Sequence, residues 1–263
     1  MARKVVNVTP IHMTCGLKSK TEYCMQTHGI YRECDYCDDS QEDKRHPPEY
    51  LTDIQDDHSP TWWQSVTMLD DVHVRPVNLT VNLGESCTVN NSIPNSKKYN
   101  VITGKKYDIT YVRLKFHSPR PFSFAIYKKD RIRPAEPDPY PEEGWIPWQY
   151  YSAACQDEYE TQDQSAIIQP KNVKKLREDR ALCTSEFSEA TPLTGANVAF
   201  STLTGRPSAY NFEYSPELQQ WVSATDIRIS LKRLNTFGDE IFGDHKVLRS
   251  YYYAIMDFTV GGR

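Results

Sequence analysis

The chain has 263 residues, a formal net charge of −4 and 17 prolines, and 38% of its residues are hydrophobic. Its lysines and arginines occur in pairs such as Lys105-Lys106 rather than in a stripe, which excludes the basic surface typical of nucleic-acid-binding proteins. No stretch approaches the roughly 20 apolar residues of a membrane-spanning helix, so we expect a folded protein with a sizeable core.

The first 60 residues carry four of the seven cysteines and follow neither the helical nor the strand period. We expect residues 1–60 to form a cysteine-rich cap and residues 61–263 to form the main body. Disulfides would tie such a loop-rich segment down, although their pairing does not follow from the sequence. An alternative is a structural zinc ion, which Cys24, Cys34, Cys37 and His46 would bind. The disulfide candidates are Cys15, Cys24, Cys34, Cys37, Cys155 and Cys183.

Three potential N-glycosylation sites favour a secreted protein and therefore disulfides over zinc. They lie at Asn7, Asn78 and Asn90, each two residues before a Ser or Thr. The N-terminal residues lack the roughly 7–15-residue apolar block of a signal peptide. We therefore expect a secretory leader to lie outside this sequence.

The loop "DIQDDHSPT" at residues 53–61 is rich in oxygen-bearing side chains. Asp53 and Thr61 bracket it, and calcium prefers carboxylate, hydroxyl and carbonyl oxygens. The alternative is that Asp53 only caps a turn. Trp62 and Trp63 follow, and on a strand they must face opposite ways, so one of them should enter the core.

Alternating apolar and polar residues predict strands from residue 78 onward. We expect the strands at 112–116 and 122–126 to pair or to lie side by side, because the connection between them is short. A short helix should begin at Ser215, with Pro216 in its first turn. Residues expected to point inward are Leu79, Val81, Leu83, Val112, Leu114, Phe116, Phe122, Phe124, Ile126, Ile227, Ile229 and Leu231.

Catalytic signatures are absent from the sequence. It has no G-x-S-x-G, H-E-x-x-H or phosphate-binding glycine motif. His117 alternates with the apolar residues of its strand, so we expect it on an exposed polar face. The missing motifs favour a protein that is not an enzyme, with a carbohydrate-active sandwich as a remote alternative. Evenly spaced strands without a βαβ rhythm predict two packed antiparallel sheets.

Several long blocks make the chain resemble the laminin N-terminal domain, most closely that of gamma chains. They include "YLTDIQDDHSPTWWQS", "YDITYVRLKFHSPRP", "WIPWQYYSAAC", "PLTGANVAFSTLTGRPSAYNF" and "SYYYAIMDFTVGGR". Together they span nearly the whole chain. The netrin N-terminal domain is the nearest alternative, and its members have cysteines where Trp62 and His117 stand here. A netrin-like domain would be a secreted guidance ligand that binds a cell-surface receptor.

This resemblance implies an all-β jelly-roll sandwich that forms one domain over residues 1–263. It also implies a secreted, glycosylated module of basement membranes, a part of the extracellular matrix. The module would polymerise with alpha and beta laminin N-terminal domains, contact cell-surface receptors and support cell adhesion and tissue morphogenesis. The family's calcium ligands match Tyr50, Asp53, Thr61 and Met256, with Tyr50 and Met256 acting through their backbone carbonyls.

Two further expectations rest on the same resemblance. Residues 85–104 interrupt a run that is continuous in the family, and they contain Cys87, which explains the odd cysteine count. The exposed block 192–208 is the expected contact with other chains, although Val198, Ala199 and Phe200 fit a strand equally well. The partner-binding candidates are Pro192, Leu193, Thr194, Gly195, Phe200, Arg206, Pro207 and Ser208.

Overall fold

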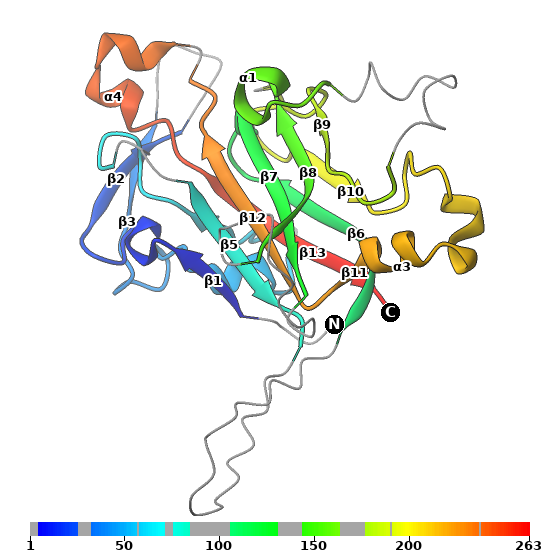
Figure 1. Ribbon diagram of the computed structural model, residues 1–263. Helices are drawn as coiled ribbons and strands as arrows, with labels where there is room; N and C mark the ends of the chain where they lie inside the picture. The colour runs from blue at the N-terminus through cyan, green and yellow to red at the C-terminus, as the bar shows by residue number, and fades with distance from the viewer. Residues whose placement is uncertain are drawn as a thin grey trace, which may run out of the picture.

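The computed structural model describes residues 5–25, 33–56, 58–71, 76–84, 106–130, 144–163, 177–189, 191–236 and 238–263. Two β-sheets lie one behind the other and enclose the core, and a two-stranded ribbon lies beside them (Figure 1). The expectation of an all-β sandwich with few short helices is confirmed. Within the described ranges, none of the helices has the length and apolar character needed to cross a bilayer.

In the part of the chain that the structure describes, the larger sheet has six strands, and its pairings are antiparallel except for one at the edge. The parallel pair is formed by the last two strands in the sheet order. Apolar residues occupy alternate positions of β5, so one face of that strand is buried and the other is half-buried. In sheet order the strands are β1 (Val6–Thr9), β5 (Val77–Asn82), β12 (Asp226–Arg233), β7 (Ser123–Lys129), β8 (Ile146–Ser152) and β9 (Leu182–Thr184).

The smaller sheet is built around the long strand β6 (Tyr107–Phe116). On one side β6 pairs with β10 (Asn197–Ser201), and on the other with the C-terminal strand β13 (Ala254–Gly262), both antiparallel. Beyond β13 lies β4 (Trp63–Gln64), and β11 (Ser223–Ala224) adds a short pairing to the start of β6. The predicted strand over residues 198–200 is confirmed by β10.

The core lies between the two inner faces. Leu79, Ile126 and Ile229 approach it from the larger sheet, and Leu114 and Phe258 approach it from the smaller sheet; all five are buried. Burying each such side chain stabilises the fold by roughly 1.5–3 kcal/mol. The inward positions expected from the alternation are thus correct for these strands. Phe122, at the start of its run, is half-buried beneath the guanidinium group of Arg233 and lies near the surface.

The expected pairing of the two strands on either side of "HSPRP" is wrong. Strand β6 lies in the smaller sheet and β7 in the larger one, and the connection passes from one sheet to the other. The rings of Phe116 and Phe124 meet across the core, with their centroids 5.8 Å apart. Both strands therefore bury an apolar face in the same core from opposite sides. Alternation of apolar residues is the same for two strands that pair in one sheet and for two strands that face each other across a core, so it could not separate these cases.

Among the described residues, the helical segments are short and lie between the strands or at the ends of the sandwich. They are η1 (Ile11–Met13), η2 (Pro48–Leu51), α1 (Cys155–Tyr159), η4 (Ala209–Tyr214), α3 (Pro216–Val222), η5 (Asp239–Phe242) and α4 (His245–Leu248). The predicted helix start is confirmed by α3: Pro216 is its first residue, and the Ser215 hydroxyl accepts a hydrogen bond from the Leu218 amide at 3.3 Å.

Replacing this capping residue should weaken the fold measurably. We expect Ser215→Ala to lower the free energy of unfolding by about 1 kcal/mol, because the Leu218 amide loses its acceptor. Ser215→Asn should retain most of the stability, since Asn also caps helices. Urea unfolding followed by circular dichroism measures both, and equal stability of Ser215→Ala and the parent would contradict this role of Ser215.

The N-terminal segment is stapled by disulfides, as expected. Strands β2 (Thr21–Cys24) and β3 (Cys34–Cys37) form the ribbon; Cys24–Cys34 joins its two strands, and Cys15–Cys37 ties its base to the preceding segment. A third disulfide, Cys155–Cys183, links α1 to β9. The zinc alternative is therefore wrong, because the sulfurs of Cys24, Cys34 and Cys37 are bonded to other sulfurs.

The division at residue 60 also needs correction, because β1 belongs to the larger sheet. Tyr23 of the ribbon packs against Tyr252 and Ala254, and Trp62 packs against the same cluster. Gly16 (φ +75°) allows the close approach of the preceding segment to β3, since a Cβ there would lie 2.7 Å from the backbone nitrogen of Asp38. The cap is thus fastened to the end of the sandwich where β13 begins.

Candidate functional site

Four oxygen-bearing residues meet at the end of the sandwich where the cap joins β13. The helical turn η2 presents the carbonyl of Tyr50, and Asp53 lies in the bend that follows. Thr61 lies just before β4, and Met256 lies within β13. The structure therefore brings together the four residues that the sequence and the family resemblance assigned to one ion site.

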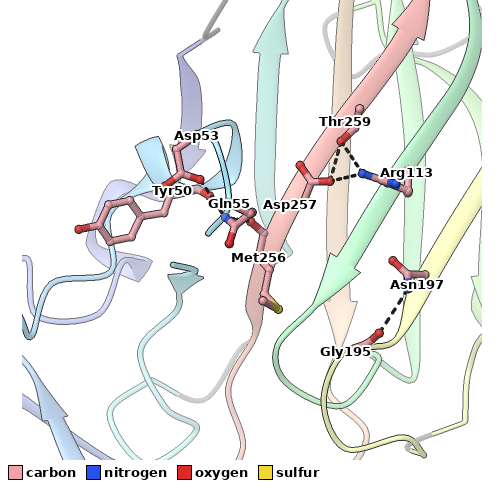
Figure 2. A network of polar contacts seen from close by, with 9 residues as sticks. All are labelled: Tyr50, Asp53, Gln55, Arg113, Gly195, Asn197, Met256, Asp257 and Thr259. Atoms are coloured by element: carbon pink, nitrogen blue, oxygen red, sulfur yellow. Dashed lines mark hydrogen bonds and ion pairs between the residues drawn. The ribbon is translucent and has the colours of Figure 1, made fainter. Parts of the chain in front are cut away.

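The side-chain amide of Gln55 lies at the point where these oxygens converge, and Figure 2 shows it between Asp53, Tyr50 and Met256. Its Nε2 atom is 2.7 Å from the carbonyl oxygen of Met256, 2.8 Å from Asp53 Oδ1, 3.0 Å from Thr61 Oγ1 and 3.5 Å from the carbonyl oxygen of Tyr50. Its Oε1 atom accepts a hydrogen bond from the Thr61 amide at 3.3 Å. Gln55 thus bridges the loop to β13.

This oxygen cluster (Tyr50 O, Asp53 Oδ1, Thr61 Oγ1 and Met256 O) offers more acceptors than the amide has protons. An amide nitrogen carries two hydrogens, so it cannot donate fully to four oxygens. The Thr61 hydroxyl donates a hydrogen bond to Asp53 Oδ2 at 2.6 Å, so the lone pairs of Thr61 Oγ1 remain available to accept one from Gln55. Converging oxygens with a surplus of lone pairs are the arrangement that a hard cation satisfies.

One formal negative charge belongs to the oxygen cluster, that of Asp53. The nearby Asp257 is bound by Arg113 Nη2 at 2.7 Å and by the Thr259 hydroxyl at 2.6 Å (Figure 2). Calcium fits this donor set better than a transition metal, because carboxylate, hydroxyl and carbonyl oxygens are hard ligands. With a single carboxylate, a calcium ion at this donor set would be held weakly, of the order of 10⁻⁴–10⁻³ M, the range found for calcium sites of extracellular modules.

A polar hollow of about 420 Å³ adjoins the cluster on the outer face of the smaller sheet. Asp53 and Gln55 line its rim, and Arg113, Lys115 and Asn197 line the part over β6 and β10. The Asn197 amide donates to the carbonyl of Gly195 at 3.4 Å (Figure 2). The hollow therefore extends from the oxygen cluster to the start of the block expected to contact other chains.

Most side chains expected to contact a partner are accessible. Pro192, Thr194 and Gly195 are exposed, and Leu193 is half-buried. The segment is held at its start by the buried Arg120, which donates to the carbonyls of Thr191 and Glu189 at 2.7 and 3.2 Å. Further along the block, Pro207 and Ser208 are half-buried.

Two of the candidates are buried. Phe200 is 6% exposed and packs on Trp148 in the core. Arg206 is 4% exposed; its guanidinium lies 4.2 Å from the Trp221 ring, and its Nη1 donates to the carbonyls of Arg180, Glu178 and Arg177. Burial lowers the pKa of Arg206 to about 10. These two side chains therefore support the fold and the loop, and they are too buried to reach a partner.

Three aromatic rings form a stack that the sequence did not reveal. Trp62 lies between His46 and His117, with ring centroids at 4.4 and 4.0 Å, while Trp63 is fully buried in the core as the alternation predicted. Burial lowers the pKa of His46 to about 4 and also lowers that of His117. The expectation that His117 lies on an exposed polar face is therefore wrong, because the indole covers it.

The glycosylation candidates that can be placed share one surface. Asn7 of β1 is exposed and Asn78 of β5 is half-buried, and both lie on the outer face of the larger sheet. Asn90, Cys87 and the rest of the insert 85–104 lie outside the described residues. The outer face of the larger sheet is thus opposite to the surface that carries the polar hollow.

Comparison with known proteins places these features in a family. The family model for the laminin N-terminal domain (Domain VI) matches residues 2–262. The chain is 50% identical to human laminin subunit gamma-1 over 262 residues, 98% of this chain, and 50% identical to the Xenopus tropicalis subunit over 254 residues, 95% of this chain. It is 47% identical to the Caenorhabditis elegans laminin-like protein lam-2 over 252 residues, also 95% of this chain.

These relatives are much longer, since the matched region covers 13–14% of their length. A chitosan-binding module from Paenibacillus sp. IK-5 aligns with 95% of this chain and 98% of the module, but at a TM-score of 0.35 and 12% identity, which is too distant to carry an argument. The match over residues 2–262 and the identities to the gamma subunits decide the assignment: this chain belongs to the laminin N-terminal domain family.

Proposed function

We propose that the chain is a secreted, non-enzymatic module of the extracellular matrix. In this proposal it acts as a gamma-type laminin N-terminal domain that polymerises with alpha and beta N-terminal domains in basement membranes. The observation that carries the proposal is the 50% identity to gamma-1 subunits over nearly the whole chain. The three disulfides are in keeping with an oxidising compartment outside the cell.

We further propose that calcium binds at the oxygen cluster and is required for assembly. The ligands would be the carbonyls of Tyr50 and Met256 and the side chains of Asp53 and Thr61. A bound cation would tie three separate segments together: the turn η2 with its bend, Thr61 two residues before β4, and β13. A methionine side chain at position 256 is tolerable in this scheme, because the proposed ligand is the main-chain oxygen of Met256.

The exposed segment around Pro192, Thr194 and Gly195 supports a contact with another chain. It projects from a rigid strand pair, since the Gly195 amide donates to the carbonyl of Phe116 at 2.8 Å. Exposed loops held by a rigid scaffold commonly carry binding sites. Individual contacts need only be weak, because linked arms in a matrix raise the effective concentration of each domain for its neighbours.

Glycans at Asn7 and Asn78 would be compatible with this arrangement. Both asparagines lie on the outer face of the larger sheet, away from the polar hollow on the smaller sheet. We therefore propose that the smaller sheet and the loops at its edge form the side that faces partner domains. Cell-surface receptors are a further class of partner in the proposal.

Assembly should require calcium and Asp53. We expect this chain and matching alpha and beta N-terminal fragments to form a ternary complex in millimolar calcium. Chelator should weaken apparent association by at least about tenfold, equivalent to ~1.4 kcal/mol. Asp53→Ala should have the same effect in the presence of calcium, because the cluster loses its carboxylate. Sedimentation velocity of equimolar mixtures gives the amount of complex.

The matched control is Asp56→Ala. Asp56 belongs to the same loop, but its carboxylate is largely exposed and accepts from the His58 amide rather than from Gln55. This variant should assemble like the parent chain. Equal amounts of complex with calcium and with chelator would remove calcium from the proposal, and no complex under either condition would contradict the assembly role itself.

A further inference from the structure

Gln55 takes part in the oxygen cluster in a way that neither the loop sequence nor the family resemblance indicated. Its Nε2 atom contacts Met256 O, Asp53 Oδ1 and Thr61 Oγ1 at 2.7–3.0 Å, and its Oε1 accepts from the Thr61 amide. The amide nitrogen thus occupies the position where the four oxygens would place a cation. A cation and this nitrogen cannot share that position.

We propose that Gln55 is an internal competitor for calcium that sets the affinity of the site. With no ion bound, the amide satisfies part of the cluster and holds the 53–61 loop against β13. When calcium binds, the amide must leave before the oxygens can coordinate the ion. This inference rests on the proposed calcium site and adds the residue that controls its occupancy.

The geometry supports displacement rather than permanent replacement of the ion. An amide has two hydrogens for four acceptors, so the cluster keeps unsatisfied lone pairs while Gln55 is in place. Calcium–oxygen distances of about 2.3–2.6 Å are shorter than the distances from Nε2 to Met256 O (2.7 Å), Asp53 Oδ1 (2.8 Å) and Thr61 Oγ1 (3.0 Å), so these oxygens need to close in by only a few tenths of an ångström. The Tyr50 carbonyl, at 3.5 Å, would have to move by roughly 1 Å. The Gln55 side chain is half-buried, which leaves it a path toward solvent.

Competition of this kind lowers the apparent affinity in proportion to the fraction of molecules in which the amide has left. If about one molecule in ten has Gln55 displaced without calcium, the apparent dissociation constant is about ten times the intrinsic one. Removing the amide should restore the intrinsic affinity. It should also release the loop when no ion is present, because the loop loses its bridge to β13.

Calcium titration by calorimetry and thermal unfolding in chelator test the inference together on the whole chain. Gln55→Ala should bind calcium about tenfold more tightly than the parent chain and should unfold at a lower temperature in chelator. Gln55→Glu should bind at least as tightly as Gln55→Ala, because it adds a carboxylate ligand. It should be the least stable of the three in chelator, since that carboxylate would lie beside Asp53.

The matched control is Gln219→Ala. The Gln219 amide also donates to two backbone carbonyls, those of Phe212 and Glu213 at 3.2 and 2.9 Å, but on the exposed surface of another part of the chain. This variant should leave calcium affinity unchanged. Gln219→Ala therefore shows what the loss of any bridging glutamine amide does to calcium affinity, and Gln55→Ala shows the effect specific to the oxygen cluster.

The possible results are distinguishable. Calcium affinity that stays within twofold of the parent in Gln55→Ala, or a chelator unfolding temperature that does not fall, would overturn competition while leaving the calcium site standing. Weaker binding by Gln55→Ala would also overturn it, because Gln55 would then be a ligand. If the parent, Gln55→Ala and Gln55→Glu all fail to bind calcium, the calcium site of the proposed function fails, and this inference fails with it.

Discussion

Arg206→Ala is expected to destabilise the domain by about 3–5 kcal/mol without removing a surface contact, because buried carbonyls lose their donor and a cavity opens. The guanidinium is 4% exposed, lies 4.2 Å from the Trp221 ring and donates through Nη1 to three backbone carbonyls between residues 177 and 180. Alanine would leave those carbonyls without this donor and would open a cavity beside the indole. Urea unfolding monitored by tryptophan fluorescence gives the free energy of unfolding.

Arg206→Lys separates the charge of this side chain from its shape. A lysine keeps the positive charge, but its single ammonium group cannot stack on Trp221 as a planar guanidinium does. We expect it to recover part of the stability lost in Arg206→Ala. A result in which both variants are as stable as the parent, yet fail to assemble with alpha and beta fragments, would show that Arg206 is a contact residue after all.

The case of Arg206 shows why a loop sequence does not separate support from contact. Gly, Pro, Ser and Thr around it predict an exposed loop, and most of residues 192–208 is accessible. Arg206 and Phe200 nevertheless face inward, one onto Trp221 and the other onto Trp148. Their burial depends on tryptophans in other elements of the fold. The sequence of residues 192–208 alone therefore does not indicate which of its side chains are buried.

The oxygen cluster was predicted in part from the loop itself. Asp53 and Thr61 have side-chain oxygens, so they could be found from residue type and spacing. Tyr50 and Met256 contribute backbone carbonyls, which every residue has, so only the family resemblance pointed to them. Gln55 was missed because its role depends on where its amide nitrogen lies in space, close to the carbonyl of a residue 201 positions away.

Strand positions were easier to predict than strand partners. Alternation identified the buried residues of β5, β6 and β12, because one face of each strand packs on the core. It did not show that β6 and β7 lie in different sheets. Similarly, the alternation that placed His117 on the outer face could not show Trp62 covering it, since that contact joins the cap to the smaller sheet.

The stacked rings of His46, Trp62 and His117 should make the domain lose stability in acid. Burial lowers the pKa of His46 to about 4, and it also lowers that of His117. In the unfolded chain both imidazoles titrate near their usual value of about 6.5. Between pH 6.5 and about 4 the unfolded chain therefore binds more protons than the folded one, so stability is complete above this window and falls with pH inside it.

The size of the loss follows from the shift. Each unit of pKa difference corresponds to about 1.4 kcal/mol, so His46 alone should cost roughly 3 kcal/mol by about pH 4. Urea unfolding with chelator present, at several values between about pH 7.5 and 4, gives the slope of unfolding free energy against pH without a contribution from calcium. Carboxylates also titrate at the lower end, so the informative quantity is the difference between variants.

His46→Asn should flatten that slope, because one of the two groups that take up protons on unfolding is gone. His12→Asn is the matched control: His12 is exposed, 3.4 Å from the carboxylate of the half-buried Asp71, and outside the stack. It should leave the slope in this window nearly unchanged. The same slope in the parent and in His46→Asn would mean that His46 takes up its proton as readily in the folded domain as in the unfolded chain, and the Trp62 stack would then not be a source of acid sensitivity.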